Sequence, residues 1–213
     1  MAHIYQVALL LEGRPCLVIG GGRVAARKVR SLLNAGAKVR VVAREATEPI
    51  RHLAEEGILD LQVREFVPED LEGAFLAIVA TDDADLNEGA SAECHRRGVL
   101  VNVVDQPALC SFYVPAVVER GPISIAISTG GASPALARRL RERLEEAVGE
   151  EYGALAALMG ELRGEVLAAF TEQSERAEAW RRLLDSDVLD LLAQGETEEA
   201  KESARRVMGI EGR

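Results

Sequence analysis

Four short polar segments carry the residue types that could do chemistry in this chain. They are a glycine-rich run at 20–25, Ala-Thr-Asp-Asp at 80–83, Asn-Val-Val-Asp at 102–105 and Ser-Thr-Gly-Gly-Ala-Ser-Pro at 128–134. Glycines at the start of a helix bind anions such as a pyrophosphate, a carboxylate can take up a proton, and hydroxyl and N–H groups can hold carboxylates. The glycine run among them indicates a site for a dinucleotide.

The glycine run follows an apolar segment, 15–19, which is typical of a strand buried on both faces. Gly20, Gly22 and Ala25 fit the pattern G-x-G-x-x-G/A, in which the first glycine permits a tight turn and the second lets the backbone approach a pyrophosphate. Apolar residues at helical spacing predict a helix over 23–35. The alternative is a glycine-rich turn without a ligand. We assign four residues to cofactor binding here: Gly20, Gly22, Arg23 and Val24.

The first hundred residues alternate between strand-like and helix-like segments. Further strands are expected at 39–43, 61–66, 75–80 and 99–104, and helices at 48–56 and 85–97. This alternation predicts α/β architecture with a Rossmann-like parallel sheet. Ligands of such sheets bind beyond the carboxyl ends of the strands. Besides the glycine run, the rule selects the polar residues that directly follow each buried run, namely Arg44, Glu45, Thr81, Asp82 and Asp105.

One expected residue is missing at the end of the second strand. An acidic side chain usually stands there to hold the adenosine ribose, but this chain has Ala43 and Arg44, with Glu45 one place later. Arg44 could meet the 2′-phosphate of NADP, or stack on adenine while Glu45 or backbone groups hold the ribose. It could also be a solvated loop residue. We include Arg44, Glu45 and Thr81 in the cofactor site, and the sequence leaves NAD against NADP open.

The pattern changes after residue 105. Two strand-like runs, 111–120 and 122–128, are joined by a link too short for a crossover helix, so they should pair antiparallel. Ser133 and Pro134 then start a helix. This α+β segment is too small to bury its own core, which predicts a homodimer. From about residue 150, apolar residues at helical spacing predict helices whose role is packing. We expect three parts: a NAD-binding domain at 1–110, a dimerisation segment at 111–149 and a C-terminal helical domain at 150–213.

Composition limits the class of protein. The 213 residues are 48% hydrophobic, and no apolar run approaches the roughly 18 residues that cross a bilayer. The N-terminus shows no secretory signal, and the three cysteines have no paired spacing, so we expect a cytoplasmic protein with reduced thiols. A net charge of −10 argues against nucleic acid as a partner.

Taken together, these motifs resemble the siroheme synthase family. The resemblance spans roughly residues 4–206 and rests on the segments 16–28, 80–83, 102–105, 111–112 and 128–134, with Leu136-Ala137-Arg138 after them. It implies NAD-dependent oxidation of precorrin-2 to sirohydrochlorin, and in some members Fe2+ insertion to give siroheme. Because no methyltransferase region follows the resembling part, we expect uroporphyrinogen methylation to belong to another protein.

The resemblance gives Asp105 the role of the catalytic base, with a part in metal insertion. On its residues alone, an aspartate at a strand end can equally cap a turn. The loop at 128–134 is the best candidate for holding substrate carboxylates, the alternative being a plain helix cap. Some members carry a phosphorylated serine there, and Thr129 stands at the aligned place with Ser128 beside it. The substrate site comprises Ser128, Thr129, Gly130, Gly131, Ser133 and Arg138.

Metal chemistry has little support in the sequence. The histidines are His3, His52 and His95, and none has the spacing of metal ligands, so no metal-binding residue is assigned and Asp105 could serve alone. Two rival functions remain. One is a module that senses a dinucleotide without chemistry, and the other is a protein that delivers a tetrapyrrole to a partner.

Overall fold

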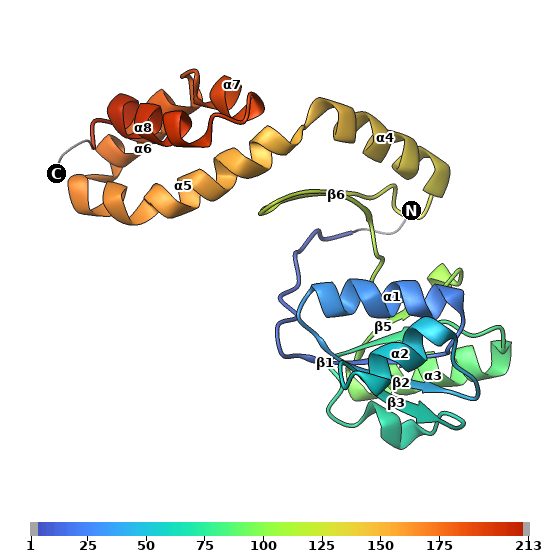
Figure 1. Cartoon of the computed structure of the whole chain (residues 1–213). Helices are drawn as coiled ribbons and strands as arrows, with labels where there is room; N and C mark the ends of the chain where they lie inside the picture. Colours follow the sequence, from blue (N-terminus) through green and yellow to red (C-terminus); the bar gives the residue numbers. More distant parts are fainter. Residues whose placement is uncertain (1–3, 211–213) are drawn as a thin grey trace. The chain divides into compact units, whose positions relative to one another are not determined.

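A computed structural model describes residues 4–210 of the chain, which forms two compact units, Met1–Val114 and Pro115–Arg213 (Figure 1). The first unit is built on a parallel sheet of five strands in the order β3-β2-β1-β4-β5. Every neighbouring pair in it is parallel, with Val18 opposite both Val41 and Ile78. The predicted Rossmann-like sheet is therefore confirmed. The strands are β1 (Pro15–Ile19), β2 (Lys38–Ala43), β3 (Asp60–Val63), β4 (Leu76–Val79) and β5 (Leu100–Val103).

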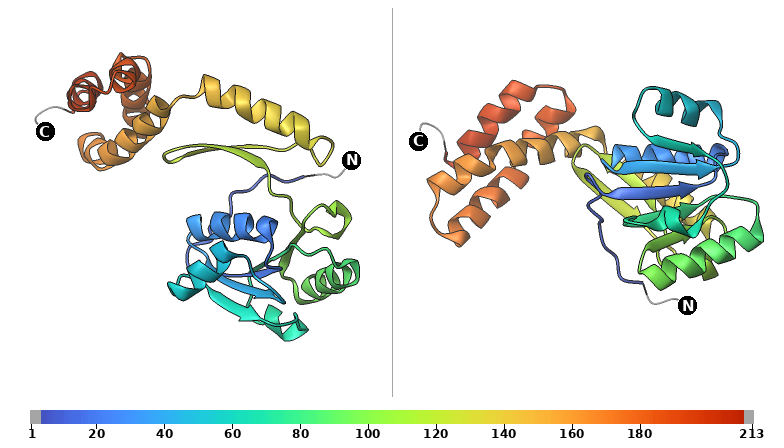
Figure 2. Two further views of the ribbon diagram at one scale, coloured as in Figure 1. Left: turned by 45° about the vertical axis from the view of Figure 1, so that its right-hand side comes forward. Right: turned by 90° about the horizontal axis from the view of Figure 1, so that it is seen from below.

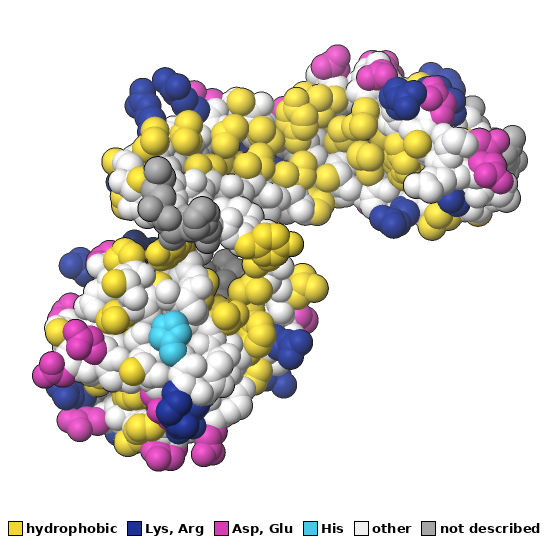
Figure 3. Space-filling view, turned by 180° about the vertical axis from the view of Figure 1, so that it is seen from behind, with side chains coloured by type: hydrophobic (Ala, Val, Ile, Leu, Met, Phe, Trp, Pro, Cys, Tyr) yellow, Lys and Arg dark blue, Asp and Glu magenta, His cyan; other side chains and the backbone are white. Residues whose placement is uncertain are grey.

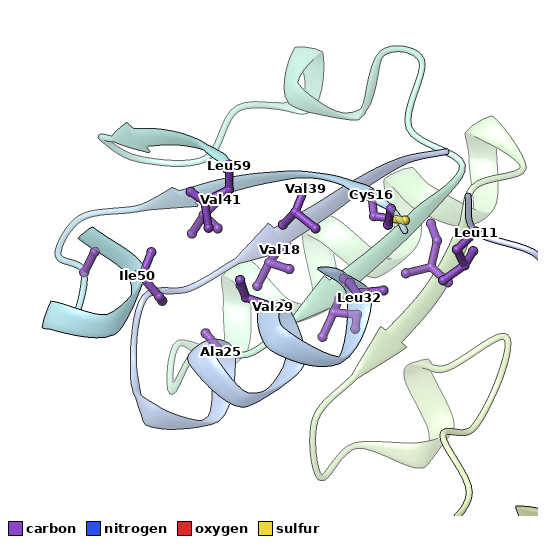
Figure 4. Close-up of a cluster of buried hydrophobic side chains, with 14 residues drawn as sticks. Leu11, Cys16, Val18, Ala25, Val29, Leu32, Val39, Val41, Ile50 and Leu59 are labelled. Carbon is purple, nitrogen blue, oxygen red and sulfur yellow. The ribbon is translucent and has the colours of Figure 1, made fainter. Parts of the chain in front are cut away.

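Helices cover both faces of this sheet. Residues Val18, Val41 and Ile78 pack with α1 and α2 on one face (Figure 4), while their neighbours Leu17, Val42 and Ala77 pack with α3 on the other. Strand residues alternate between the two faces, and since both faces are buried the strands read as continuous apolar runs. The helices are α1 (Arg23–Asn34), α2 (Glu48–Glu55) and α3 (Ala84–Arg97), with short 3-10 turns η1 (Pro68–Leu71) and η2 (Pro107–Leu109).

Two strands have an end that differs from the prediction by more than one residue. The third was expected over 61–66, but β3 ends at Val63, and the next side chain, Arg64, turns to pair with Asp70. The first strand of the hairpin was expected from 111 but begins at Ala116. The preceding residues belong to the first unit, because Ser111 N donates to the carbonyl oxygen of Val101 at 2.8 Å.

The second unit begins with an antiparallel hairpin of β6 (Ala116–Arg120) and β7 (Ile123–Ile127), as predicted, followed by α4 (Pro134–Ala147). Arg120 ties the hairpin to the end of α4, since its Nε donates to the carbonyl oxygen of Val148 at 2.9 Å. Gly153 lets the next helix approach closely, because a Cβ there would lie 2.7 Å from the Arg120 carbonyl carbon.

The rest of the second unit is helical, as expected, and Figure 2 shows these helices in two further views. Its core contains Leu158, Leu162, Leu183 and Met208, each almost fully buried. Within residues 4–210, no helix combines the length and the apolar character that crossing a bilayer demands. The helices are α5 (Glu150–Ala169), α6 (Gln173–Leu184), α7 (Val188–Ala193) and α8 (Thr197–Met208).

Candidate functional site

The glycine loop after β1 is shaped by two close backbone contacts. Gly20 has a φ of +116°, and a Cβ there would lie 2.3 Å from the carbonyl oxygen of Ala80. A Cβ on Gly21 would lie 2.0 Å from the carbonyl oxygen of Glu45. Both positions require glycine, since a side chain would push the loop away from the ends of β2 and β4. A Cβ on Gly22, by contrast, would meet nothing within 4 Å.

Helix α1 starts at this loop without a side-chain cap. Its N-cap residue is Gly22, and the first intrahelical bond runs from Ala26 N to the Gly22 carbonyl oxygen at 2.9 Å. The N–H groups of the first turn therefore have no acceptor within the helix. Arg23 and Val24 are exposed in that turn. Free N–H groups, the helix dipole and an open approach at Gly22 together fit a pyrophosphate.

A cavity of about 240 Å³ lies in front of the loop. Its lining brings together Gly20, Gly22, Arg44, Glu45 and Thr81, five of the predicted cofactor residues. Arg23 and Val24 are not among the lining residues and sit beside it on α1. The cavity therefore has the parts that a dinucleotide needs: a glycine cradle, a helix N-terminus and polar side chains at the ends of β2 and β4.

Thr81 is held by the helix that follows it. Its hydroxyl lies 2.6 Å from Asn87 Oδ1, and Asn87 Nδ2 donates to the Thr81 carbonyl oxygen at 3.1 Å. Asn87 is buried on α3. The end of β4 is thus fixed at the rim of the cavity by a buried amide that sequence reasoning did not single out.

Acidic side chains surround Arg44, and no local sequence pattern indicated them. Arg44 Nε lies 3.2 Å from Glu65 Oε1, and a terminal nitrogen lies 3.8 Å from Asp83 Oδ2. The second arginine of the cavity, Arg64, forms two hydrogen bonds with Asp70, at 2.8 and 2.5 Å. This pairing holds the pKa of the Asp70 carboxyl below its ordinary value, mainly through the hydrogen bond from Arg64. Residues far apart in sequence meet at this rim, so local patterns could not reveal the pairs.

Asp105 stands two residues beyond β5, at the edge of the sheet where the cavity also lies. It has a φ of +60° and is the one non-glycine residue with a positive φ among residues 4–210. The turn that contains it is closed by a bond from Gln106 N to the Val103 carbonyl oxygen at 3.3 Å. Such a conformation costs a non-glycine residue about 1 kcal/mol or more, and these outliers cluster at functional sites. The exposed Asp105 is accordingly a candidate for chemistry.

Lys28 on α1 is an electrostatic neighbour of Asp105. The pKa of its ammonium is lowered, first by burial and then by Arg27, while the charge of Asp105 acts in the opposite direction. The sequence analysis assigned no site role to Lys28. The structure adds it to the side chains around the candidate base.

The second predicted site, the loop before α4, lies in the second unit. Ser133 caps the helix by accepting a hydrogen bond from Leu136 N at 3.2 Å. Thr129 Oγ1 accepts from Ser133 N at 3.1 Å, and Ser128 Oγ accepts from Gly130 N at 3.2 Å. The three hydroxyls thus stabilise the loop itself, while Arg138 is exposed one turn into the helix. Gly130 and Gly131 have φ values of +64° and +81°.

Metal ligands do not gather anywhere in residues 4–210. No group of three or more His, Cys, Asp or Glu side chains is placed to hold an ion there. His52 lies 3.5 Å from Glu56 on the same helix, and His3 lies outside the described residues.

Three family models match successive parts of the chain. One described as "Putative NAD(P)-binding" matches residues 7–116, "Sirohaem biosynthesis protein central" matches 120–147, and "Sirohaem synthase dimerisation region" matches 151–208. The chain belongs to the siroheme synthase family. The resemblance noted in the motifs is therefore confirmed. The model described as NAD(P)-binding covers the part of the first unit that carries the glycine loop and the cavity in front of it.

Relatives agree with this membership of the siroheme synthase family. The siroheme synthase of Methylococcus capsulatus is 44% identical over 195 residues, which is 92% of this chain and 41% of that protein. That of Nitrosospira multiformis is 43% identical over 203 residues, 93% of this chain and 43% of the relative. The chain thus spans about two fifths of the length of these relatives. A solved structure named SirC, precorrin-2 dehydrogenase, aligns with a TM-score of 0.75 at 29% identity, covering 95% of this chain and 100% of that one.

Proposed function

We propose that this chain oxidises precorrin-2 to sirohydrochlorin with NAD as the oxidant. The observation that carries the proposal is Asp105, an acid held at φ +60° at the same sheet edge as an uncapped glycine loop. The alignment with a precorrin-2 dehydrogenase over that protein's whole length supports it. We keep the cytoplasm as the proposed compartment, since Cys16, Cys94 and Cys110 are all free thiols.

The oxidation removes two electrons and two protons from the macrocycle. One hydrogen leaves with both electrons as a hydride, which the nicotinamide ring accepts when the cofactor is bound, and the other leaves as a proton. The first turn of α1, with Gly20 and Gly22, holds the pyrophosphate. Arg44, Glu45 and Thr81 flank the rest of the cofactor at the ends of β2 and β4.

Asp105 takes up the proton in this proposal. Its side chain is exposed beyond β5, where a substrate can approach it. Lys28 places a positive charge near it, which attracts a substrate that carries many carboxylates. The protein has a net charge of −10, so such local positive charge is needed for an acidic substrate to approach.

The loop at 128–134 is proposed to hold substrate carboxylates. Because Ser128, Thr129 and Ser133 already bond within the loop, they shape it rather than reach out as free donors. Arg138 supplies an exposed guanidinium one turn into α4, and two guanidinium N–H groups match a carboxylate. Gly130 and Gly131 give the loop its left-handed turn.

A homodimer is proposed for the second unit. A two-stranded sheet is marginal by itself, and Leu136 and Leu140 of α4 are 51% and 38% exposed. Figure 3 shows hydrophobic side chains gathered over the face of this unit that it displays. The family model described as a dimerisation region matches residues 151–208. The sequence analysis placed the dimer contact in the preceding segment, 111–149. The proposed contact therefore includes both segments.

The test is spectroscopic. Anaerobic precorrin-2 mixed with NAD and the protein should give the absorbance of sirohydrochlorin, with one NADH formed for each product molecule. Asp105→Ala should lose turnover by about a hundredfold or more while NADH binding stays within about twofold. If the spectrum does not change with either nicotinamide cofactor, the chain is a dinucleotide sensor or a tetrapyrrole-delivery protein. An Asp105→Ala protein with full activity would remove this residue from the mechanism.

A further inference from the structure

The basic side chains that line the cofactor cavity are already paired with acids. We propose that Glu65 and Asp83 make this chain selective for NAD, because they withhold Arg44 from the 2′-phosphate of NADP. The inference rests on the proposed function in one respect, that the glycine loop holds a nicotinamide dinucleotide. It settles a choice that the missing acid at the end of β2 had left open.

Arg44 occupies the position from which a Rossmann domain reads the adenosine 2′ group. Its Nε is 3.2 Å from Glu65 Oε1, and its terminal nitrogen is 3.8 Å from Asp83 Oδ2. These side chains are well exposed, at 65% for Arg44 and 74% for Glu65. Ion pairs with such exposure add little to the stability of a fold. What they change is the charge that a ligand meets at this position.

Arg64 cannot replace Arg44 as a phosphate ligand. Both of its terminal nitrogens bond to Asp70, and one also donates to the carbonyl oxygen of Glu65 at 2.9 Å. The side chain of Asp70 is only 5% exposed, and it also accepts from Val67 N at 2.9 Å. Moving Arg64 toward a phosphate would leave a buried carboxylate without its partner, which is costly.

The charge of the lining is unfavourable for a phosphate. Two guanidinium groups face four carboxylates, a formal excess of two negative charges among the described residues around this cavity, and a phosphate monoester would add nearly two more. The ribose of NAD carries a neutral hydroxyl at the same place, and carboxylates accept hydrogen bonds from hydroxyls. The four acids are Glu45, Glu65, Asp82 and Asp83.

The test measures binding of NADH and NADPH by titration calorimetry, so it needs no turnover. The wild-type protein should bind NADPH at least about tenfold more weakly than NADH. The double variant Glu65→Gln/Asp83→Asn should reduce that preference by about tenfold, since it releases Arg44 and removes two negative charges. Asparagine keeps the cap that Asp83 provides to Leu86 N, so α3 should stay intact.

A matched control is Asp85→Asn/Glu88→Gln. It removes the same charge from exposed positions on α3 that do not line the cavity, and it should leave the preference unchanged. Adding Arg44→Ala to the first double variant should abolish the gain in NADPH affinity relative to NADH. Wild-type protein that binds NADPH as tightly as NADH would overturn the proposal and leave the dinucleotide function standing, as would an unchanged preference in the double variant. Protein that binds neither cofactor would overturn both.

Discussion

Each unit of this protein places a loop with glycines directly before a helix, but the two loops end differently. In the first unit α1 follows Gly22, which lines the cavity and has no side chain to cap the helix, so the N–H groups of the first turn have no acceptor within the helix. In the second unit Ser133 accepts a hydrogen bond from Leu136 N, which satisfies part of the first turn of α4. A helix N-terminus that binds an anion is best left uncapped, because a cap competes for the same donors.

The glycines of the two loops also serve different needs. Gly20 and Gly21 are pressed against backbone carbonyl oxygens, so the first loop is fixed by close contact. In the second loop Gly131 has a left-handed φ but open space around its Cα. The first loop is therefore a rigid cradle, whereas hydroxyl hydrogen bonds give the second its shape. The first should accept substitutions less well than the second.

The largest effect is expected at Gly21. An added Cβ would lie 2.0 Å from the Glu45 carbonyl oxygen, and backbone cannot move aside cheaply. Gly21→Ala should lower the free energy of unfolding by about 3 kcal/mol, as forced overpacking does. Chemical denaturation measures this loss of stability, and Gly131→Ala in the second loop is the variant to compare with it. Gly131 has φ +81°, so that change should cost only about 1 kcal/mol from backbone strain. Equal losses at the two positions would show that the loops do not differ in rigidity.

Gly22→Asp would give the first loop the cap that the second one has. The position has φ −77° and an open Cβ direction, so the side chain fits. The free energy of unfolding should rise by a few tenths of a kcal/mol, because aspartate caps a helix slightly better than glycine. NADH affinity should fall by about a hundredfold, since a carboxylate then occupies the phosphate donors. Titration with NADH measures the affinity, and thermal unfolding measures the stability. An unchanged NADH affinity would mean that the pyrophosphate binds elsewhere.

The sequence was sufficient for the features that depend on neighbouring residues. Apolar runs and glycine spacing located β1, α1 and the cradle, and Ser133-Pro134 located the start of α4. These signals work because a strand, a helix start or a turn depends on a few adjacent side chains. The five strands of the sheet were all anticipated for the same reason.

Features that depend on distant residues were out of reach. The pairing of Arg44 with Glu65 and Asp83 joins the ends of three different elements, and nothing near Arg44 in the sequence announces it. The positive φ of Asp105 lies in a turn closed by the bond from Gln106 N to the Val103 carbonyl oxygen, and no sequence pattern indicated that this residue would adopt it. The ends of two strands, at Val63 and Ala116, were misjudged because side-chain and backbone hydrogen bonds beyond each predicted end were not visible as propensity. Arg64 pairs with Asp70 directly after the first, and Ser111 bonds to Val101 before the second.

Removing the cap of the second loop should have a moderate effect. Ser133→Ala deletes the acceptor for Leu136 N and should lower the free energy of unfolding by about 1 kcal/mol, a typical cost for a lost N-cap. Ser128→Ala, which removes only the bond from Gly130 N on an exposed residue, should cost less than half as much. Urea denaturation of the two variants compares them. Equal losses would mean that the cap does not dominate the stability of this loop.

A small effect on stability, but the most telling result, is expected at Asp105. The second loop uses glycine at its left-handed positions, whereas the first unit holds an aspartate at φ +60°. Asp105→Gly should raise the free energy of unfolding by roughly 0.5 kcal/mol, because glycine adopts this conformation without steric cost. Precorrin-2 oxidation should nevertheless be lost, since the proposed base is gone. Asp105→Asn serves as the control, because asparagine tolerates the same φ and should leave stability nearly unchanged. A variant that is both more stable and fully active would show that the strain at Asp105 has no part in catalysis.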